Sequence, residues 1–332
     1  MKFNDILANL RKKIYQPVYF LMGDETYFID EICDYIANHV LDESEKEFNQ
    51  TVLYGKDTDV ADIISEVKRF PLMGTHNVVI VKEAQHIRKI EDLEVYLEQP
   101  QPSTILVICY KYKTLDKRKK FSKELAKKGV LFESKKLYDS QVPDWIQNYL
   151  GKYNYSIHPK AAFLLSEYLG ADLGKITNEL DKLMLIIKKG QEITSDIIEH
   201  NIGISKDFNN FELNNALGQR DVLKSNLIIK QFTANPKENP LFVTIGVLFS
   251  FFQKTLLYHT LKDKSKNNVA SNLKVNPFFV RDYELAARNY SKEKLVKIIS
   301  YLREYDLKSK GVNNNSVSDG KLLKELIYKI LH

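Results

Sequence analysis

Cysteine is scarce in this sequence of 332 residues. The two cysteines, Cys33 and Cys109, are far apart along the chain and have no partners at metal-ligand spacing. That pattern excludes a disulfide framework and a zinc site of the usual kind, and it fits a reducing cytoplasm. Each cysteine lies in an apolar segment, so we expect both to be buried in the core.

Long hydrophobic runs are also missing. No segment reaches the ~18 unbroken apolar residues of a membrane-spanning helix. The closest run, LFVTIGVLFSFF (241–252), is shorter and contains a threonine and a serine, which favours a buried helix. The N-terminal segment has apolar residues at helical spacing without an apolar block, so we expect no secretion signal. These observations predict a cytoplasmic protein that does not associate with membranes.

Catalytic signatures are absent as well. The seven histidines show no HExxH-like pairing, and none lies near a serine or cysteine in a known nucleophile motif. The chain also shows no metal-binding carboxylate pair for nucleotidyl transfer. We therefore expect no catalytic residues, no metal site and no cofactor.

The first part of the chain contains alternating strand and helix patterns. Strands are predicted from continuously apolar runs at 18–22, 51–54, 78–81, 105–109 and 131–133. Amphipathic helices are predicted between them at 26–41, 59–70, 87–97 and 115–128. Strands that are apolar throughout are typical of a sheet covered on both faces. The expected fold is a parallel, doubly wound α/β sheet.

The strand patterns stop after residue 142, and the rest of the chain has helical patterns. Helices are predicted from 143 and at 158–169, 172–188 and 194–202, and about five more from Phe211 onward, with a polar loop at 310–320. We expect three domains: an α/β domain at 1–142, a small all-α domain at 143–208 and a larger all-α domain at 209–332.

The stretch YFLMGDETYF (19–28) has the strand–glycine–helix shape of a nucleotide site but lacks its chemistry. A phosphate-binding loop needs several backbone N–H groups, a lysine and a hydroxyl. Here Asp24 and Glu25 occupy the helix start, where we expect them to cap it and to repel phosphate. The strand that would supply an Asp-Glu pair for magnesium ends in Lys82 and Glu83 instead. The sequence therefore predicts no ATP hydrolysis.

Several stretches together resemble the delta subunits of bacterial DNA polymerase III clamp loaders. The stretches that carry the resemblance, in chain order, are PVYFLMGDETYFIDE, RFPLMGTHNVVIVKEA, LDKRKKFSKELAKKG, LGADLGKITNELDKLMLI, NPFFVRDYELAARNYS and LREYDLKSKG. They are spread over nearly the whole length, and their order makes the resemblance specific.

The resemblance implies both a fold and a role. The fold is an AAA+-like domain with a degenerate phosphate loop, followed by a helical lid and a helical collar. The role is to bind the sliding clamp and open its ring, as a non-catalytic subunit of the DNA polymerase III holoenzyme, a nucleotidyltransferase complex. The implied partners are the clamp, the ATPase subunits and delta prime of the loader, and primed DNA through the assembled complex.

The resemblance also points to clamp-binding residues, namely Phe70, Leu72 and Met73. Phe70 lies at helical spacing from Val67, so we expect it on the apolar face of the preceding helix. Pro71 disfavours helical geometry at Phe70, so we expect that helix to end there. Taken alone, the residues also allow another interpretation, in which Leu72 and Met73 fold back under the helix and close the core. In the family this position presents an apolar plug to a pocket on the clamp.

A basic segment at 111–136 contains eleven Lys or Arg against three acidic residues, a local charge of +8 in a chain of net charge +6. Such a segment favours DNA or an acidic partner, with Lys117, Arg118, Lys119 and Lys120 as its candidate residues. The plainer alternative is a solvated helix face. Two other functions stay open from the residues alone: an ATP-binding AAA+ ATPase or switch, and a stand-alone nucleic-acid-binding protein.

Overall fold

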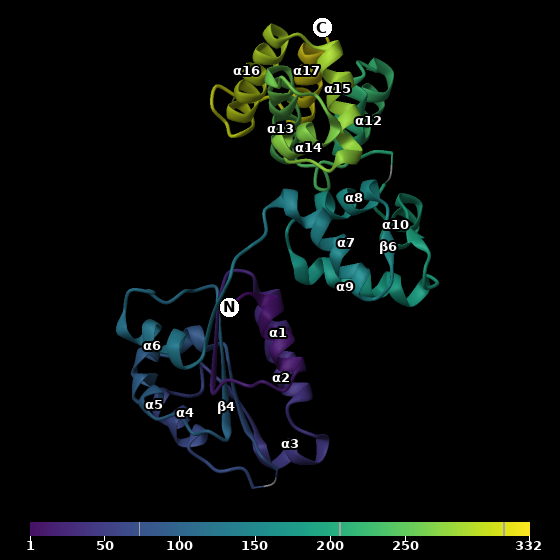
Figure 1. The fold of residues 1–332 in the computed structure, drawn as a ribbon. Coiled ribbons are helices and arrows are strands. Elements are labelled where there is room, and N and C mark those ends of the chain that lie inside the picture. The colour runs from purple at the N-terminus through teal and green to yellow at the C-terminus, as the bar shows by residue number, and fades with distance from the viewer. Residues whose placement is uncertain (73, 206, 315) are drawn as a thin grey trace. The chain divides into compact units, whose positions relative to one another are not determined.

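The computed structural model describes residues 1–72, 74–205, 207–314 and 316–332. The chain divides into two compact units, Met1–Leu137 and Tyr138–His332 (Figure 1). The division into three domains, with boundaries at 142/143 and 208/209, stays a prediction.

The first unit is built on a parallel sheet of five strands in the order β2-β3-β4-β1-β5. The strands are β1 (Val18–Gly23), β2 (Gln50–Tyr54), β3 (Asn77–Lys82), β4 (Thr104–Lys111) and β5 (Val130–Ser134). All five predicted strands are confirmed, and each is one to three residues longer than predicted. β1 and most of β3 and β4 are buried, because helices cover both faces of the sheet.

Each face of the sheet has its own helices (Figure 1). α1 (Phe3–Arg11) and α2 (Thr26–His39) pack on one face through Ile6, Leu10 and Ile29. The other face is covered by α4 (Val60–Val67), α5 (Glu94–Glu98) and α6 (Lys120–Lys128). A short helix, α3 (Glu43–Asn49), leads directly into the edge strand β2. The predicted doubly wound arrangement is confirmed.

Three α-helices of the first unit are at least four residues shorter than predicted. α4 ends at Val67 rather than at residue 70, because the N–H of Arg69 turns back to the carbonyl of Glu66. The same carbonyl oxygen also lies 3.4 Å from Asn77 Nδ2. The helix predicted at 87–97 begins only after Lys89, which has a left-handed backbone (φ 51°), and it consists of the 3₁₀ turn η2 (Ile90–Leu93) followed directly by α5. α6 begins only at Lys120 because Asp116 first accepts the N–H of Arg118 in a turn.

The second unit is almost entirely helical. Its first four helices, α7 (Val142–Lys152), α8 (Pro159–Leu169), α9 (Leu173–Ile186) and α10 (Ser195–Ile202), lie where they were predicted. Two paired strands of two residues each, β6 (Ser156–Ile157) and β7 (Glu192–Ile193), were not predicted, because so short a segment has no periodicity to detect. The remaining short turns of the described chain are η1 (Ala84–His86), η3 (Asp139–Gln141) and η4 (Pro277–Phe279).

Beyond residue 207 the described chain forms seven α-helices rather than about five. They are α11 (Asn210–Gly218), α12 (Val222–Ala234), α13 (Leu241–Thr260), α14 (Lys266–Leu273), α15 (Val280–Asn289), α16 (Lys292–Ser309) and α17 (Asp319–Leu331). The left-handed backbone of Lys274 (φ 53°) and the following Pro277 separate α14 from α15. Short helices of this kind have too few turns for their pattern to stand out.

α13 is apolar enough, by length and composition, to cross a membrane. Leu241, Ile245, Leu248, Phe251 and Phe252 of this helix lie in the main core cluster of the second unit. The prediction of a buried core helix is therefore confirmed.

Candidate functional site

The loop between α4 and β3 carries two apolar side chains in solvent. Phe70 is 76% exposed and Leu72 is 77% exposed. The apolar face of α4 that packs on the sheet contains Ile63 and Val67, and it does not extend to Phe70 as predicted, since the helix has already ended. The alternative in which Leu72 folds back into the core is therefore wrong. The third predicted residue, Met73, lies outside the described residues.

Buried amide side chains tie this loop to the sheet. The Oδ1 of Asn49, at the last position of α3, accepts the N–H of Leu72 at 2.8 Å. Asn49 is 1% exposed and Asn77 is 5% exposed. Farther along the loop, Gly74 has φ 71°, and a Cβ built there would lie 1.9 Å from Oε1 of Glu45 in α3. The loop is thus fitted closely against α3 and the start of β2.

Two backbone donors of the turn between β1 and α2 are already bonded to other parts of the first unit. The N–H of Gly23 donates to the carbonyl of Lys113 (3.1 Å), and the N–H of Asp24 donates to the carbonyl of Ser134 (3.0 Å). A Cβ on Gly23, whose φ is 123°, would lie 2.0 Å from that Ser134 oxygen. Neighbouring strands therefore fill the space that a phosphate-binding loop leaves open.

The acidic residues of this turn have different roles. Glu25 is the N-cap of α2, and its carboxylate accepts the N–H of Tyr27 at 3.2 Å, as predicted. Asp24 is exposed, and the structure records no cap hydrogen bond to it. At the end of β3, Glu83 forms an ion pair with Lys56 (3.4 Å). Among the described residues no group of three or more His, Cys, Asp or Glu could hold a metal ion.

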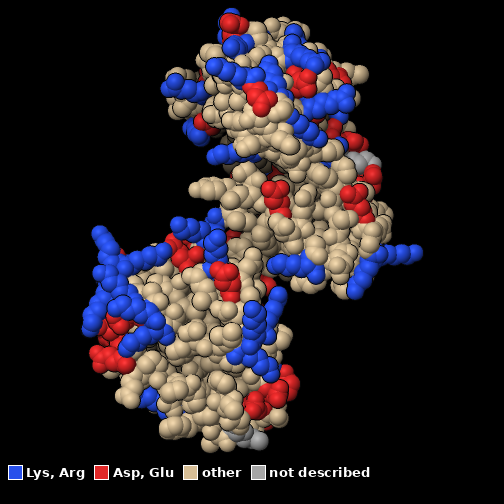
Figure 2. Space-filling model, in the orientation of Figure 1, with Lys and Arg blue, Asp and Glu red and all other residues tan. Residues whose placement is uncertain are grey.

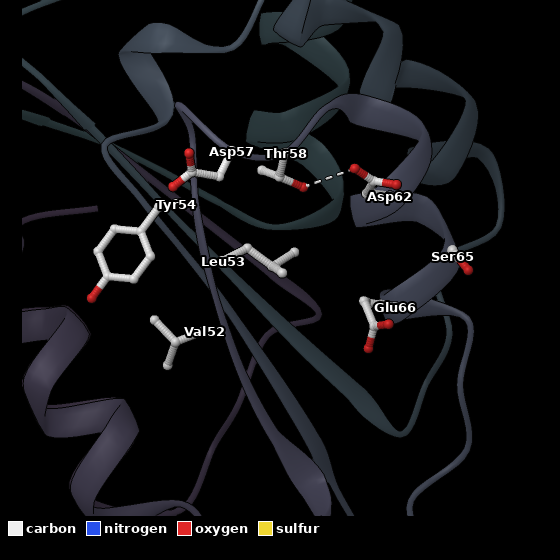
Figure 3. A pocket seen from close by; sticks show the side chains of 8 residues that line it. All are labelled: Val52, Leu53, Tyr54, Asp57, Thr58, Asp62, Ser65 and Glu66. Atoms are coloured by element: carbon white, nitrogen blue, oxygen red, sulfur yellow. Dashed lines mark hydrogen bonds between the residues drawn. The ribbon is translucent and has the colours of Figure 1, made fainter.

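A shallow pocket of about 400 Å³ lies between the edge strand β2 and α4 (Figure 3). Leu53 forms part of its floor, and Asp57, Asp62 and Glu66 line its walls. Asp62 accepts hydrogen bonds from Thr58 (3.4 Å) and from the N–H of Asp59 (3.3 Å), so it serves to cap α4. An acidic lining repels phosphate, which makes this pocket unsuitable for a nucleotide.

The four candidate residues of the basic segment are ion-paired. Arg118 pairs with Asp116 (2.8 Å) and Lys119 pairs with Glu91 (2.7 Å). The other two pairs are Lys117 with Glu133 and Lys120 with Glu94. Glu91 and Glu94 come from outside the segment, so the sequence count of +8 overstates its local charge. Figure 2 shows the red carboxylates among the blue side chains where Figure 1 places α6.

The two cysteines, far apart in the sequence, are brought together in the core between α2 and β4. Both are buried free thiols. The hydrogen bond between them and burial raise the pKa of Cys109 well above its ordinary value. The expected burial is confirmed, whereas their proximity could not be read from spacing along the chain.

The second unit contains an acid with a buried carboxylate, Glu167, which the sequence did not reveal. Neither carboxylate oxygen of Glu167 in α8 has a hydrogen-bond partner within normal geometry among the described residues. Burial raises the pKa of Glu167 to about 7, although Asn210 and the backbone of Phe211 lie close enough to favour the ionised form in part. Its neighbour Glu212 differs, because Lys160 and Lys224 neutralise it.

Two family models match the chain. The model described as DNA polymerase III, delta subunit, matches residues 19–135, and the model of the delta subunit's C-terminal domain matches residues 207–327. The first spans the sheet, the closed turn and the exposed loop. The second spans α11 to α16 and most of α17.

Two relatives from Bacillus subtilis match over nearly their whole length. DNA polymerase III subunit delta is 32% identical over 335 residues, which cover 97% of this chain and 94% of the relative. The solved structure of the clamp loader delta protein aligns with a TM-score of 0.53 and 28% identity, over 99% of both chains. These likenesses and the parallel sheet confirm the predicted fold class, an α/β unit followed by helices.

Proposed function

Because the chain belongs to the delta subunit family of DNA polymerase III, we propose that it binds the sliding clamp and opens its ring for loading onto primed DNA during replication. The observation that carries this proposal is the exposed pair Phe70 and Leu72 on a loop tied to the sheet. Two large apolar side chains exposed next to each other on a fixed loop are suited to a binding surface. Met73 belongs to the same proposed plug.

The plug needs help from neighbouring contacts. Burying two such side chains contributes about 1.5–3 kcal/mol each, while association costs at least ~4 kcal/mol. Phe48 of α3, which is 53% exposed and precedes Asn49, offers further apolar surface beside the loop. Opening the ring then requires that the chain bind the opened clamp more tightly than the closed one.

ATP hydrolysis is assigned in this proposal to other subunits. The closed turn at Gly23 supports that division of labour, because its N–H groups are already bonded to Lys113 and Ser134. The chain would act as a non-catalytic subunit in the cytoplasm, without a cofactor. Its partners would be the ATPase subunits and delta prime, and primed DNA reached through the assembled loader.

The helices of the proposed collar offer surface for those subunits. Leu223 of α12 is 73% exposed, and Phe242 of α13 is 62% exposed. Apolar residues at such exposure on adjacent packed helices suit contact with neighbouring subunits. The predicted boundary at 208/209 places both in the collar.

The deciding experiment uses the purified full chain, the clamp and nicked circular DNA that carries the clamp. We expect a stable complex with the clamp, and release of clamp from the circle without ATP, since only ring opening is needed. A chain that neither binds the clamp nor releases it would overturn the proposal.

The same preparation separates the two rival functions. Binding of labelled ATP at micromolar concentration in equilibrium dialysis would favour an ATPase or switch. Tight DNA binding by the isolated chain, falling steeply with salt, would favour a stand-alone nucleic-acid-binding protein. The ion pairs of Lys117–Lys120 argue against the second rival.

A further inference from the structure

The hydrogen bond between Asn49 and Leu72 joins residues that are 23 positions apart in the chain. Asn49 is almost fully buried at the junction of α3 and β2, so its carboxamide is fixed by the surrounding fold. Its Oδ1 accepts the backbone N–H of the residue that carries one of the most exposed leucine side chains in the described chain. A buried acceptor thus holds an exposed apolar residue by its backbone.

We propose that Asn49 is the positioning residue of the clamp-binding plug, which it orders before the clamp arrives. This inference rests on the proposed function and adds to it a residue that does not itself belong to the plug. Backbone held in place before binding has less conformational entropy to lose on binding. The side chain of Leu72 is left free for contact, because the hydrogen bond engages its backbone N–H and the side chain is 77% exposed.

Two other features act on the same loop. At its start, Asn77 Nδ2 lies 3.4 Å from the carbonyl of Glu66 at the end of α4. At Gly74 the left-handed φ of 71° disfavours any other residue, and an added Cβ would force the carboxylate of Glu45 to move. Hydrogen bonds therefore hold the loop at its start and in its middle, and Asn49 supplies the middle contact.

The test compares clamp binding by Asn49→Ala and Asn49→Asp in the full chain. Asn49→Ala removes the acceptor, so we expect clamp affinity to fall about three- to tenfold and exchange of the Leu72 amide hydrogen to become faster. Asn49→Asp keeps an acceptor oxygen, so affinity should stay within about twofold of wild type. Its thermal stability should nevertheless fall, because a carboxylate would be buried at the C-terminal end of α3.

Ser134→Ala is the matched control. Its hydroxyl donates to the carbonyl of Glu25 at 2.7 Å and is equally buried, but it lies on β5 at the other end of the sheet order. We expect this variant to lose stability without losing clamp affinity. If affinity instead follows thermal stability across Asn49→Ala, Asn49→Asp and Ser134→Ala, Asn49 is merely structural and the inference is wrong.

Two more variants keep the result decisive. Should Asn49→Ala fail to fold, Gly74→Ala strains the backbone of the same loop with Asn49 intact, and wild-type affinity in that variant would contradict the premise that order in this loop sets clamp affinity. Leu72→Ser identifies which proposal has failed. If it weakens binding while the folded positioning variants do not, the positioning role is wrong; if it has no effect either, the proposed clamp site itself is wrong.

Discussion

At the carboxyl edge of the first unit's sheet the backbone closes around Gly23, whereas at the amino edge the chain holds Phe70 and Leu72 in solvent. Open α/β sheets usually bind ligands at the carboxyl edge, where loops and helix N-termini converge. Here that edge is filled by Lys113, Ser134 and the Glu25 cap. In the proposed function the binding surface therefore lies at the opposite edge of the sheet, where Phe70 and Leu72 are exposed.

The largest effect is expected from the amino edge. Changing Phe70 and Leu72 together to Ser removes about 3–6 kcal/mol of apolar burial, so clamp affinity should fall by about a hundredfold or more. Surface plasmon resonance with immobilised clamp measures it. Leu185→Ser is the control, because Leu185 is also highly exposed (87%) but lies in the second unit. If Leu185→Ser lost as much clamp affinity as the double variant, Phe70 and Leu72 would not be a specific clamp-binding site.

A substitution at the carboxyl edge is expected to lower the stability of the first unit. A side chain at Gly23 meets a backbone oxygen at 2.0 Å and requires a strained φ of 123°. Gly23→Ala should therefore destabilise the first unit by roughly 2–6 kcal/mol, as the sum of overpacking and strain. Chemical denaturation measures this, with Gly151→Ala as control, because a Cβ there meets nothing within 4 Å. A folded, fully stable Gly23→Ala protein would show that the turn has room for a ligand after all.

Glu167 provides a reference that touches neither edge. An acid with a raised pKa is most compatible with the fold while it is protonated. As pH rises from about 4.5 to about 7, the unfolded chain loses a proton that the folded chain keeps, so stability falls and stays lower above pH 7.

The pKa difference corresponds to roughly 3 kcal/mol at most. Glu167→Gln should remove this loss, so the variant should exceed wild type in stability at pH 8 and approach it near pH 4.5. Thermal unfolding across that range measures the difference, and clamp affinity at pH 8 should not change. A pH-independent difference between the two proteins would contradict the assignment of the raised pKa to Glu167.

The smallest effect is expected at the basic segment. Glu91→Gln with Glu94→Gln releases Lys119 and Lys120 from their ion pairs. DNA binding should then become slightly tighter, and its dependence on log salt concentration should steepen by about 1 to 2, because each freed cation can reach one phosphate. Glu179→Gln, which releases Lys182 in the second unit, is the matched control. An unchanged salt dependence would mean that these cations do not face DNA even when they are free.

Much of the fold followed from local patterns. Buried parallel strands are apolar throughout, so all five appeared in the sequence within a few residues of their ends. Helix ends were less accurate, because α4 and α6 are limited by Asn77 and by the Asp116 turn, which lie outside the helices themselves. Two-residue strands such as β6 have no pattern at all.

The candidate site divides in the same way. The sequence alone shows the apolar residues at positions 70 and 72, the missing phosphate-loop lysine and the resemblance to the delta family. Whether Leu72 lies in the core or in solvent was not, because an apolar side chain after a helix can do either. The contact that decides it comes from Asn49, on a different element.

Residue types and their local periodicity were enough to predict the α/β-then-helical order, the family and the loss of a phosphate-binding loop. The closed turn at Gly23, the exposure of Phe70 and Leu72 and the ion pairs of Lys117–Lys120 became visible only in the folded chain. These outcomes depend on contacts between distant residues, and residue order alone does not specify which of them meet.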